Sequence, residues 1–269
     1  MLYPKERFYA SNTRNDKEWK VKTTISKLVK TERMFAIAFL VALLGFLIVT
    51  IFRANFHPVD VAINLWIPSI QSSALTFFAQ AIALIFDTIS LVIISLVISG
   101  VLFLKNCKAQ GLLLLTAMGG DALIISALKT LEHISRPTNA ISFDTGFSYP
   151  SGHSAGCVVF GGLLAYFAWR HWQSKGSRVA IGVGLGMVVG VVGFDRVYLN
   201  VHWLSDVFGG WLFGAFWLLF VILVFRQLNV AGKFQSDKFN QVANVLFALA
   251  VVVAILIVLL PLFGFSLVF

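Results

Sequence analysis

Three short stretches of the sequence hold residue types that bind and transfer phosphoryl groups. In the first, Lys129 and Arg136 stand seven residues apart, directly before Pro137. A spacing of seven places both cations on one helix face, about two turns apart. Proline disfavours helical geometry in the residue before it, so the helix should end near Arg136. Together the Lys point charge and the planar Arg fork could clamp a phosphate. The alternative is a pair of helix-end cations that reach for the membrane interface.

The second stretch is Pro-Ser-Gly-His at 150–153, where an apolar run begins. Free backbone N–H groups at a helix start attract phosphate. Gly152 would let the backbone approach an anion closely, and Ser151 would add a hydroxyl donor. His153 would lie at the mouth of a membrane span, where it could give a proton to a leaving oxygen. The plainer alternative is an ordinary helix start with polar interface residues.

The third stretch runs from Arg196 to Asp206 and contains His202. Arg196 ends one apolar run and His202 begins the next. Asp206 follows His202 by four residues, so both can lie on one face of a helix. A carboxylate bonded to one ring nitrogen would fix the tautomer and leave the lone pair of the other nitrogen free. His202 is therefore a candidate nucleophile, although a lone His-Asp pair is more often structural.

Combined, the three stretches supply three cations, a helix start, two histidines and a carboxylate. Phosphoryl transfer depends mainly on positioning and charge stabilisation, which these groups could provide. No cysteine cluster or carboxylate-rich set indicates a metal. We interpret the two cysteines, Cys107 and Cys157, as structural. The sequence therefore predicts a phosphoryl-transfer site that needs no metal and no other cofactor.

Two further polar residues lie near the first stretch. Asp121 is inside an apolar run, two turns before Lys129. It is expected to make an intramembrane hydrogen bond or, alternatively, to contact Lys129. His133 follows Lys129 by one turn and could face the same site.

The composition indicates which kind of protein must position these residues. Hydrophobic residues make up 58% of the 269 residues and charged residues only 12%, against about 25% charged in soluble domains. This balance is typical of a multi-pass membrane protein. The net charge of +9 could indicate nucleic-acid binding. The basic residues lie in a leader and in short loops between apolar runs, however, so the lipid bilayer is the expected partner and nucleic acid is not.

The apolar runs predict a bundle of membrane-spanning helices. Residues 1–33 should form a basic cytoplasmic leader. The segment 57–86, with Pro58, Asp60 and Pro68, should form interfacial or re-entrant helices rather than a full span. Residues 226–269 should hold a cytoplasmic loop and an extra C-terminal span. Seven runs are expected to cross the membrane: 34–51, 87–104, 111–128, 153–170, 179–195, 203–225 and 242–264.

The distribution of charge predicts the orientation of these spans. With the N-terminus inside, the inner segments hold 17 of the 21 Lys and Arg residues. This bias satisfies the positive-inside rule and places all three stretches on the extracytoplasmic side. The outer side keeps four cations, Arg53, Lys129, Arg136 and Arg196. Because cations at membrane depth are costly, the three at the ends of apolar helices, Lys129, Arg136 and Arg196, are functional candidates.

The three stretches resemble the signature of the type 2 phosphatidic acid phosphatase (PAP2) superfamily. That signature reads Lys-x6-Arg-Pro, then Pro-Ser-Gly-His, then Ser-Arg-x5-His-x3-Asp, and residues 129–137, 150–153 and 196–206 match it in order and spacing. The resemblance implies an all-α, six-helix core within residues 34–225, with the C-terminal span as an addition. One position departs, because Asp195 stands where the family usually has Ser. Asp195 is expected to face Arg196 or solvent.

The resemblance also implies a two-step reaction without a metal. His202 would attack phosphorus and form a phosphohistidine, with Asp206 orienting its ring. His153 would protonate the leaving oxygen and then activate water. The phosphoryl oxygens would be held by Lys129, Arg136, Ser151, the Gly152 N–H and Arg196.

The expected substrate is a lipid phosphate or diphosphate of the cytoplasmic membrane. Undecaprenyl diphosphate comes first, because an outward-facing site suits the recycling of a carrier released outside. Phosphatidylglycerophosphate and phosphatidic acid come next. Two alternatives stay open, a lipid phosphotransferase and a lipid transporter or flippase without catalysis. A vanadate-dependent peroxidase uses a related site, but the membrane-embedded composition argues against it.

Overall fold

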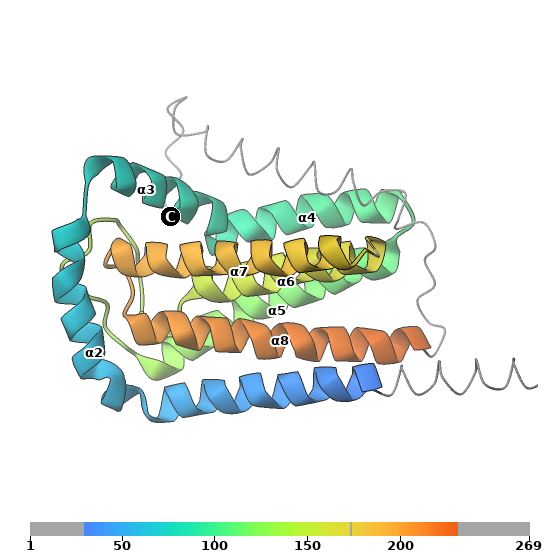
Figure 1. Ribbon diagram of the computed structural model, residues 1–269, viewed down its shortest axis with the longest axis horizontal. Coiled ribbons are helices and arrows are strands. Elements are labelled where there is room, and N and C mark those ends of the chain that lie inside the picture. Colours follow the sequence, from blue (N-terminus) through green and yellow to red (C-terminus); the bar gives the residue numbers. More distant parts are fainter. Residues whose placement is uncertain (1–29, 173, 231–269) are drawn as a thin grey trace, which may run out of the picture.

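The computed structural model describes residues 30–172 and 174–230, which form a bundle of helices without a strand among them (Figure 1). The predicted all-α membrane bundle is confirmed. The expected C-terminal span at 242–264 and most of the leader, 1–29, lie outside the described residues. In chain order the elements are an N-terminal helix at Lys30–Ile51, α2 (Arg53–Trp66), the 3₁₀ turn η1 (Ile67–Ile70), α3 (Ser73–Phe86), α4 (Thr88–Leu104), α5 (Lys108–Glu132), α6 (Gly152–His171), α7 (Lys175–Tyr198) and α8 (Leu204–Val230).

Five of the described helices are long and apolar enough to cross a membrane, so the chain is a multi-pass membrane protein. A sixth span exists only if α3 and α4 are counted together, because they meet at a bend of 49°. Asp87 lies at this bend and caps α4, with its carboxylate accepting the Ile89 N–H at 2.8 Å. The five single spans are Lys30–Ile51, Lys108–Glu132, Gly152–His171, Lys175–Tyr198 and Leu204–Leu228.

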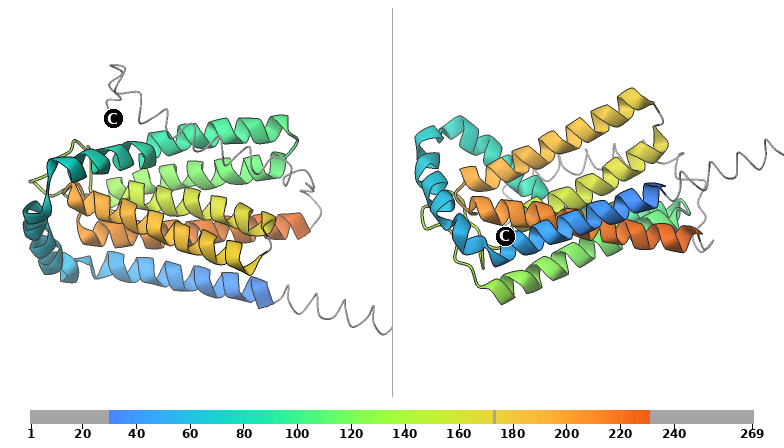
Figure 2. Two further views of the ribbon diagram at one scale, coloured as in Figure 1. Left: turned by 45° about the horizontal axis from the view of Figure 1, so that its top comes forward. Right: turned by 60° about the horizontal axis from the view of Figure 1, so that its bottom comes forward.

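The segment 57–86 contains no helix of membrane-spanning length. It comprises most of α2, the η1 turn and α3, and α2 runs across one end of the bundle (Figures 1 and 2). Buried Asp60 of α2 accepts hydrogen bonds from the backbone N–H of Ser205 at 2.9 Å and from its hydroxyl at 2.7 Å. These bonds fix α2 to the first turn of α8. The interfacial position of the segment in a membrane stays a prediction.

Helix α6 is at the centre of the bundle and packs against α4, α5, α7 and α8. Its contact with α8 is very close. A Cβ atom at Gly210 would lie 2.5 Å from the Ser151 carbonyl oxygen, and one at Gly214 would lie 2.7 Å from the Ala155 carbonyl oxygen. Glycine is required at both places, because small residues let membrane helices approach backbone to backbone. The N-terminus of α6 is thereby held against the N-terminal half of α8.

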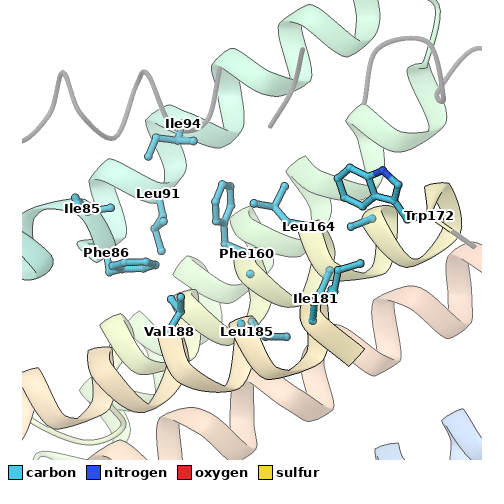
Figure 3. Close-up of a pocket in the computed structure, with 15 residues that line it drawn as sticks. Ile85, Phe86, Leu91, Ile94, Phe160, Leu164, Trp172, Ile181, Leu185 and Val188 are labelled. Atoms are coloured by element: carbon cyan, nitrogen blue, oxygen red, sulfur yellow. The ribbon is translucent and has the colours of Figure 1, made fainter. Parts of the chain in front are cut away.

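An apolar pocket of about 470 Å³ opens between the α3–α4 bend, α6 and α7 (Figure 3). Its lining is almost entirely hydrocarbon. It extends from the bend at Phe86 to Trp172, just beyond the end of α6. The side chains that line it include Ile85, Phe86, Leu91, Phe160, Leu164 and Leu185.

Candidate active site

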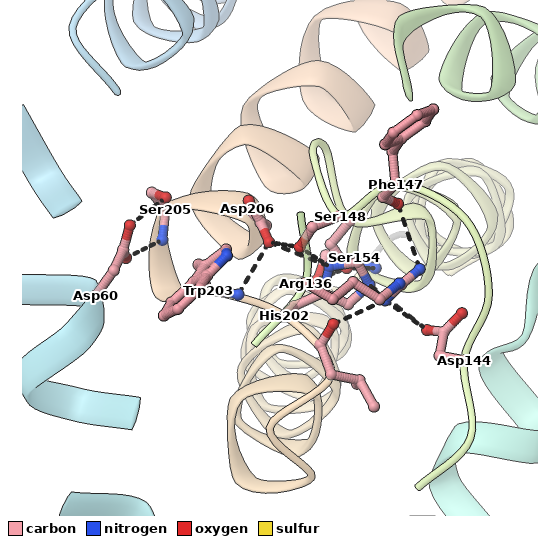
Figure 4. A network of polar contacts seen from close by, with 12 residues as sticks. Asp60, Arg136, Asp144, Phe147, Ser148, Ser154, His202, Trp203, Ser205 and Asp206 are labelled. Atoms are coloured by element: carbon pink, nitrogen blue, oxygen red, sulfur yellow. Dashed lines mark hydrogen bonds and ion pairs between the residues drawn. The ribbon is translucent and has the colours of Figure 1, made fainter. Parts of the chain in front are cut away.

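The three sequence motifs meet at the end of the bundle crossed by α2 (Figures 1 and 4). Arg136 lies in the loop between α5 and α6, and His202 lies in the short turn between α7 and α8. His153 is the second residue of α6. The loops and helix ends therefore position the polar groups, while the helices themselves supply the apolar bundle.

Two predicted helical relationships are wrong. Helix α5 ends at Glu132, because His133 adopts a left-handed backbone with φ of 50° and its N–H bonds to the Lys129 carbonyl at 3.2 Å. Arg136 therefore does not share a helix face with Lys129. Similarly, His202 and Asp206 do not lie on one helix, because α8 begins only at Leu204.

Asp206 is a fully buried carboxylate with four partners. Its Oδ2 accepts the Trp203 backbone N–H at 2.9 Å and the Ser148 hydroxyl, and lies 3.4 Å from His202 Nδ1. Its Oδ1 accepts a hydrogen bond from Arg53 Nη2 at 2.8 Å. A carboxylate held on all sides can fix the orientation of the imidazole beside it.

His202 is buried, with its two ring nitrogens in different surroundings. Nδ1 faces Asp206 and the Ser148 hydroxyl, each at 3.4 Å. Nε2 faces Arg136, with Nη1 at 3.2 Å. Burial, and after it the positive charges of Arg136 and Lys129, lower the pKa of His202 well below its ordinary 6.5. The ring is therefore neutral near pH 7, with the Nε2 lone pair turned toward the cations.

Arg136 is enclosed by its own loop. Its guanidinium donates to the carbonyl oxygens of Thr145 at 3.0 Å, Gly146 at 3.1 Å and Phe147 at 3.3 Å. Nη1 also donates to the Val201 carbonyl at 2.7 Å and lies 2.9 Å from Asp144 Oδ2. These bonds hold the guanidinium beside the imidazole of the neighbouring turn.

His153 and Arg196 line an open pocket of about 640 Å³ beside this cluster. Nε2 of His153 lies 3.8 Å from Asp87 Oδ1 at the α3–α4 bend. Arg196 is buried, and Asp195 Oδ2 accepts a hydrogen bond from its Nε at 2.8 Å. Asp195 therefore faces Arg196. The other oxygen of Asp195, Oδ1, has no hydrogen-bond partner among the described residues.

The remaining predicted phosphate contacts belong to α6 and α5. The Ser151 hydroxyl caps α6, where its oxygen accepts the Ser154 N–H at 3.4 Å and the Ser154 hydroxyl at 3.0 Å. Gly152 is the first residue of α6, and N–H groups at a helix start have no acceptor within the helix. Lys129 is half-buried in the last turn of α5, and its ammonium group makes no hydrogen bond or ion pair in the part of the chain that the structure describes.

Asp121 and His133 do not make the contacts that were expected of them. Asp121 is buried, but its Oδ1 has no hydrogen-bond partner, and it makes no ion pair with Lys129 in the described ranges. His133 is exposed, and its ring packs 4.4 Å from the ring of Phe147, centroid to centroid. Neither residue contacts His202.

Four residues at the site were missed by sequence reasoning. Arg53 and Ser148 bind Asp206, Asp144 pairs with Arg136, and Asp87 lies near His153. Arg53 carried a signal, because it is one of the few cations on the predicted outer side. Neither the residue type nor the spacing of Ser148, Asp144 and Asp87 marked them as site residues.

No group of three or more His, Cys, Asp or Glu side chains is placed to hold a metal ion within residues 30–172 and 174–230. The described groups at the site include imidazoles, guanidinium groups, carboxylates and backbone groups. A neutral imidazole next to cations, a second histidine and a helix start is a geometry suited to a phosphoryl group.

A family model described as the PAP2 superfamily matches residues 110–230, which contain all three motifs. Residues 110–230 belong to the PAP2 superfamily. A crystal structure titled as a transmembrane PAP2 type phosphatidylglycerolphosphate phosphatase from Bacillus subtilis superposes with a TM-score of 0.63 at 27% identity. The match covers 74% of this chain and 98% of that one.

Two curated relatives of the chain are named as phosphatases. Phosphatidylglycerophosphatase B of Bacillus subtilis is 34% identical over 130 residues, which are 47% of this chain and 63% of that protein. Undecaprenyl-diphosphatase of Sulfolobus acidocaldarius is 34% identical over 97 residues, which are 34% of this chain and 40% of that protein. The chain thus aligns with less than two thirds of the length of either relative.

Proposed function

We propose that the protein is a membrane lipid phosphatase that uses His202 as its nucleophile. The observation that carries this proposal is the His202 ring, whose Nδ1 faces a buried, fully bonded carboxylate while Nε2 faces a guanidinium. A lipid substrate is supported by the membrane-spanning helices and by the apolar pocket at the α3–α4 bend. Ile85 and Phe86 line this pocket, and their chain neighbours Leu84 and Asp87 line the pocket of His153. The names of the relatives support the same class of reaction.

The proposed reaction has two steps. In the first, the Nε2 lone pair of His202 attacks phosphorus, the bond from phosphorus to the leaving oxygen breaks, and His153 gives that oxygen a proton. In the second, His153 takes a proton from water, the water oxygen attacks the phosphohistidine, and inorganic phosphate is released from His202. Arg136, Lys129 and Arg196 stabilise the negative charge that the phosphoryl oxygens carry in both steps.

The proposed substrate is a lipid phosphate or diphosphate, with undecaprenyl diphosphate first, then phosphatidylglycerophosphate and phosphatidic acid. The proposed location is the cytoplasmic membrane, with a cytoplasmic N-terminus and an extracytoplasmic site. This orientation is supported by the excess of Lys and Arg in the leader and in the loops on the opposite side of the bundle from His202.

A phosphate-release assay across these three lipids tests the proposal. Purified protein in detergent micelles should release phosphate from at least one of them, with EDTA present, and His202→Gln should abolish release while the protein stays folded. Release that survives His202→Gln would reject the histidine mechanism. If none of the three lipids releases phosphate, a transporter is favoured. If a labelled phosphoryl group of the substrate is recovered in a second lipid, a phosphotransferase is favoured.

A further inference from the structure

The carboxylate of Asp144 lies between the two groups that must contact a phosphoryl group. Its Oδ2 is 2.9 Å from Arg136 Nη1 and 3.8 Å from His202 Nε2 (Figure 4). Both neighbours come from motifs of the proposed reaction, whereas Asp144 belongs to none of them. A phosphoryl oxygen that binds Arg136 while Nε2 attacks phosphorus has to come to this place.

Two of the three candidate phosphate-binding cations are thus already neutralised by a carboxylate. Arg136 is paired with Asp144, and Arg196 is paired with Asp195. Only Lys129 lacks an anionic partner in the described part of the chain. A phosphate that enters must therefore compete with carboxylates for its own binding groups, which lowers its apparent affinity.

The two carboxylates differ in how easily they can be displaced. The side chain of Asp195 is only 2% exposed, and it is the chain neighbour of the arginine that it binds. The side chain of Asp144 is 22% exposed and lines the open pocket beside His153. Asp144 can therefore turn into that pocket, whereas Asp195 has no comparable space.

Only the side chain of Asp144 needs to move, because its loop is tied down on both sides. Before it, the Ile141 N–H bonds to the Leu199 carbonyl at 3.0 Å. After it, the carbonyls of Thr145, Gly146 and Phe147 bind Arg136 itself. Arg136 thus keeps its position when the carboxylate leaves, and a phosphoryl group can take the vacated place.

We propose that Asp144 is a specificity-determining residue that occupies the phosphoryl position in the free enzyme and so discriminates against small phosphates. Inorganic phosphate has only its own charge with which to displace the carboxylate. A lipid phosphate gains further binding energy from its hydrocarbon chain. The inference rests on the proposed phosphatase function, because it assigns the site between Arg136 and His202 to a phosphoryl group.

Asp144→Asn tests this inference, with inorganic phosphate as the probe. The variant keeps the size of the side chain and removes its charge. If Asp144 occupies the site about nine tenths of the time, the phosphate concentration that half-maximally raises the thermal unfolding temperature should fall about tenfold. Glu132→Gln is the matched control, because it removes one carboxylate at the end of α5 that makes no ion pair with Arg136, and it should leave that concentration unchanged.

A second measurement follows substrate preference. In Asp144→Asn, kcat/KM for the water-soluble p-nitrophenyl phosphate should rise about tenfold relative to kcat/KM for the preferred lipid phosphate. Asp144→Ser should behave in the same way, which protects the test against an effect of the asparagine side chain or against poor folding of one variant.

Weaker phosphate binding in both variants would overturn the inference, because Asp144 would then serve to hold Arg136 in place. Unchanged binding and unchanged preference would overturn it as well. In either case His202-dependent phosphate release by the wild-type protein would leave the proposed function standing. If the wild-type protein releases phosphate from no lipid, the proposed function fails, and this inference falls with it.

Discussion

At the scale of single residues, the site depends on how Asp206 is held. The carboxylate is fully buried and bonded to Arg53, Ser148 and Trp203, so little of its freedom is left. Arg53 is the only one of these partners with a charge. Its guanidinium also lies 5.2 Å above the ring of Tyr149, whose hydroxyl bonds to Thr50 at 2.7 Å. The start of α2 is thereby connected, through one ion pair, to the carboxylate beside the proposed nucleophile.

Arg53→Met should impair both activity and stability. It leaves the Asp206 charge buried without its cation, which costs about 3 kcal/mol for a buried pair. It also loosens the carboxylate that orients His202, so kcat should fall about tenfold or more while KM changes little. Arg53→Lys should retain more activity and more stability than Arg53→Met, because the positive charge is kept. Thermal unfolding and steady-state kinetics measure the two effects, and wild-type values for Arg53→Met would refute the role of Arg53.

The protonation of His202 can be measured directly. Its lowered pKa means that the proton is lost well below pH 6.5, so the free enzyme should hold a neutral His202 ring at pH 6. Protonation would remove the nucleophilic lone pair, so the acid limb of kcat/KM that belongs to His202 should also lie below pH 6.5. The ring ¹⁵N chemical shifts of protein labelled at histidine, recorded without phosphate, report the protonation state of His202. The His202 signals are assigned by their loss in His202→Gln. A titration midpoint at or above 6.5 would contradict the described geometry.

At the scale of elements, the close contact between α6 and α8 sets the geometry of the site. Gly210 of α8 meets the backbone of Ser151, where the second motif opens α6. Asp206 and Gly210 are one turn apart in α8, so the contact positions the orienting carboxylate relative to His153. An ion pair or hydrogen bond alone would tolerate a shift of the helices that this contact does not.

Gly210→Ala should therefore separate α6 from α8. The added Cβ would lie 2.5 Å from the Ser151 carbonyl oxygen, and relief of this overlap should cost about 1–3 kcal/mol. Activity should fall by about two orders of magnitude, because a displacement near 1 Å has that effect on catalytic groups. Gly190→Ala in α7 is the control, since an added Cβ there meets nothing within 4 Å. Equal behaviour of the two variants would count against this packing argument.

At the scale of the whole molecule, the sequence predicted the class of fold. Apolar periodicity and composition predicted a helical membrane bundle because they depend on local properties. The loops that hold Arg136 and His202 lie at one end of the bundle, where the two side chains meet at 3.2 Å. Backbone breaks such as the left-handed His133 were not predictable from residue type, so Arg136 was wrongly expected on a helix.

Tertiary partners were beyond the reach of the sequence for a related reason. The carboxylate of Asp144 meets Arg136 because a loop folds back, and nothing in its neighbours marks this. Arg53 meets Asp206 across 153 residues of chain. Such contacts depend on how loops and helix ends come together, which spacing along the chain does not encode.

The proposed orientation of the whole molecule can be tested with single added cysteines. Thr138→Cys lies in the exposed loop between α5 and α6, and Gly176→Cys lies near the start of α7 at the other end of the bundle. The native Cys107 and Cys157 are buried and should not react. A membrane-impermeant maleimide should label Thr138→Cys in intact cells, but Gly176→Cys only after permeabilisation. The reverse pattern would overturn the outward-facing site.

The measurement that tests the central claim most directly is the capture of the reaction intermediate. Wild-type protein is mixed with a lipid substrate labelled with ³²P in the phosphoryl group to be transferred, quenched in alkali within one turnover, and mapped by mass spectrometry. We predict acid-labile phosphate on His202, and none on the protein in His202→Gln. Phosphate on another residue, or labelling and turnover that persist in His202→Gln, would contradict the account.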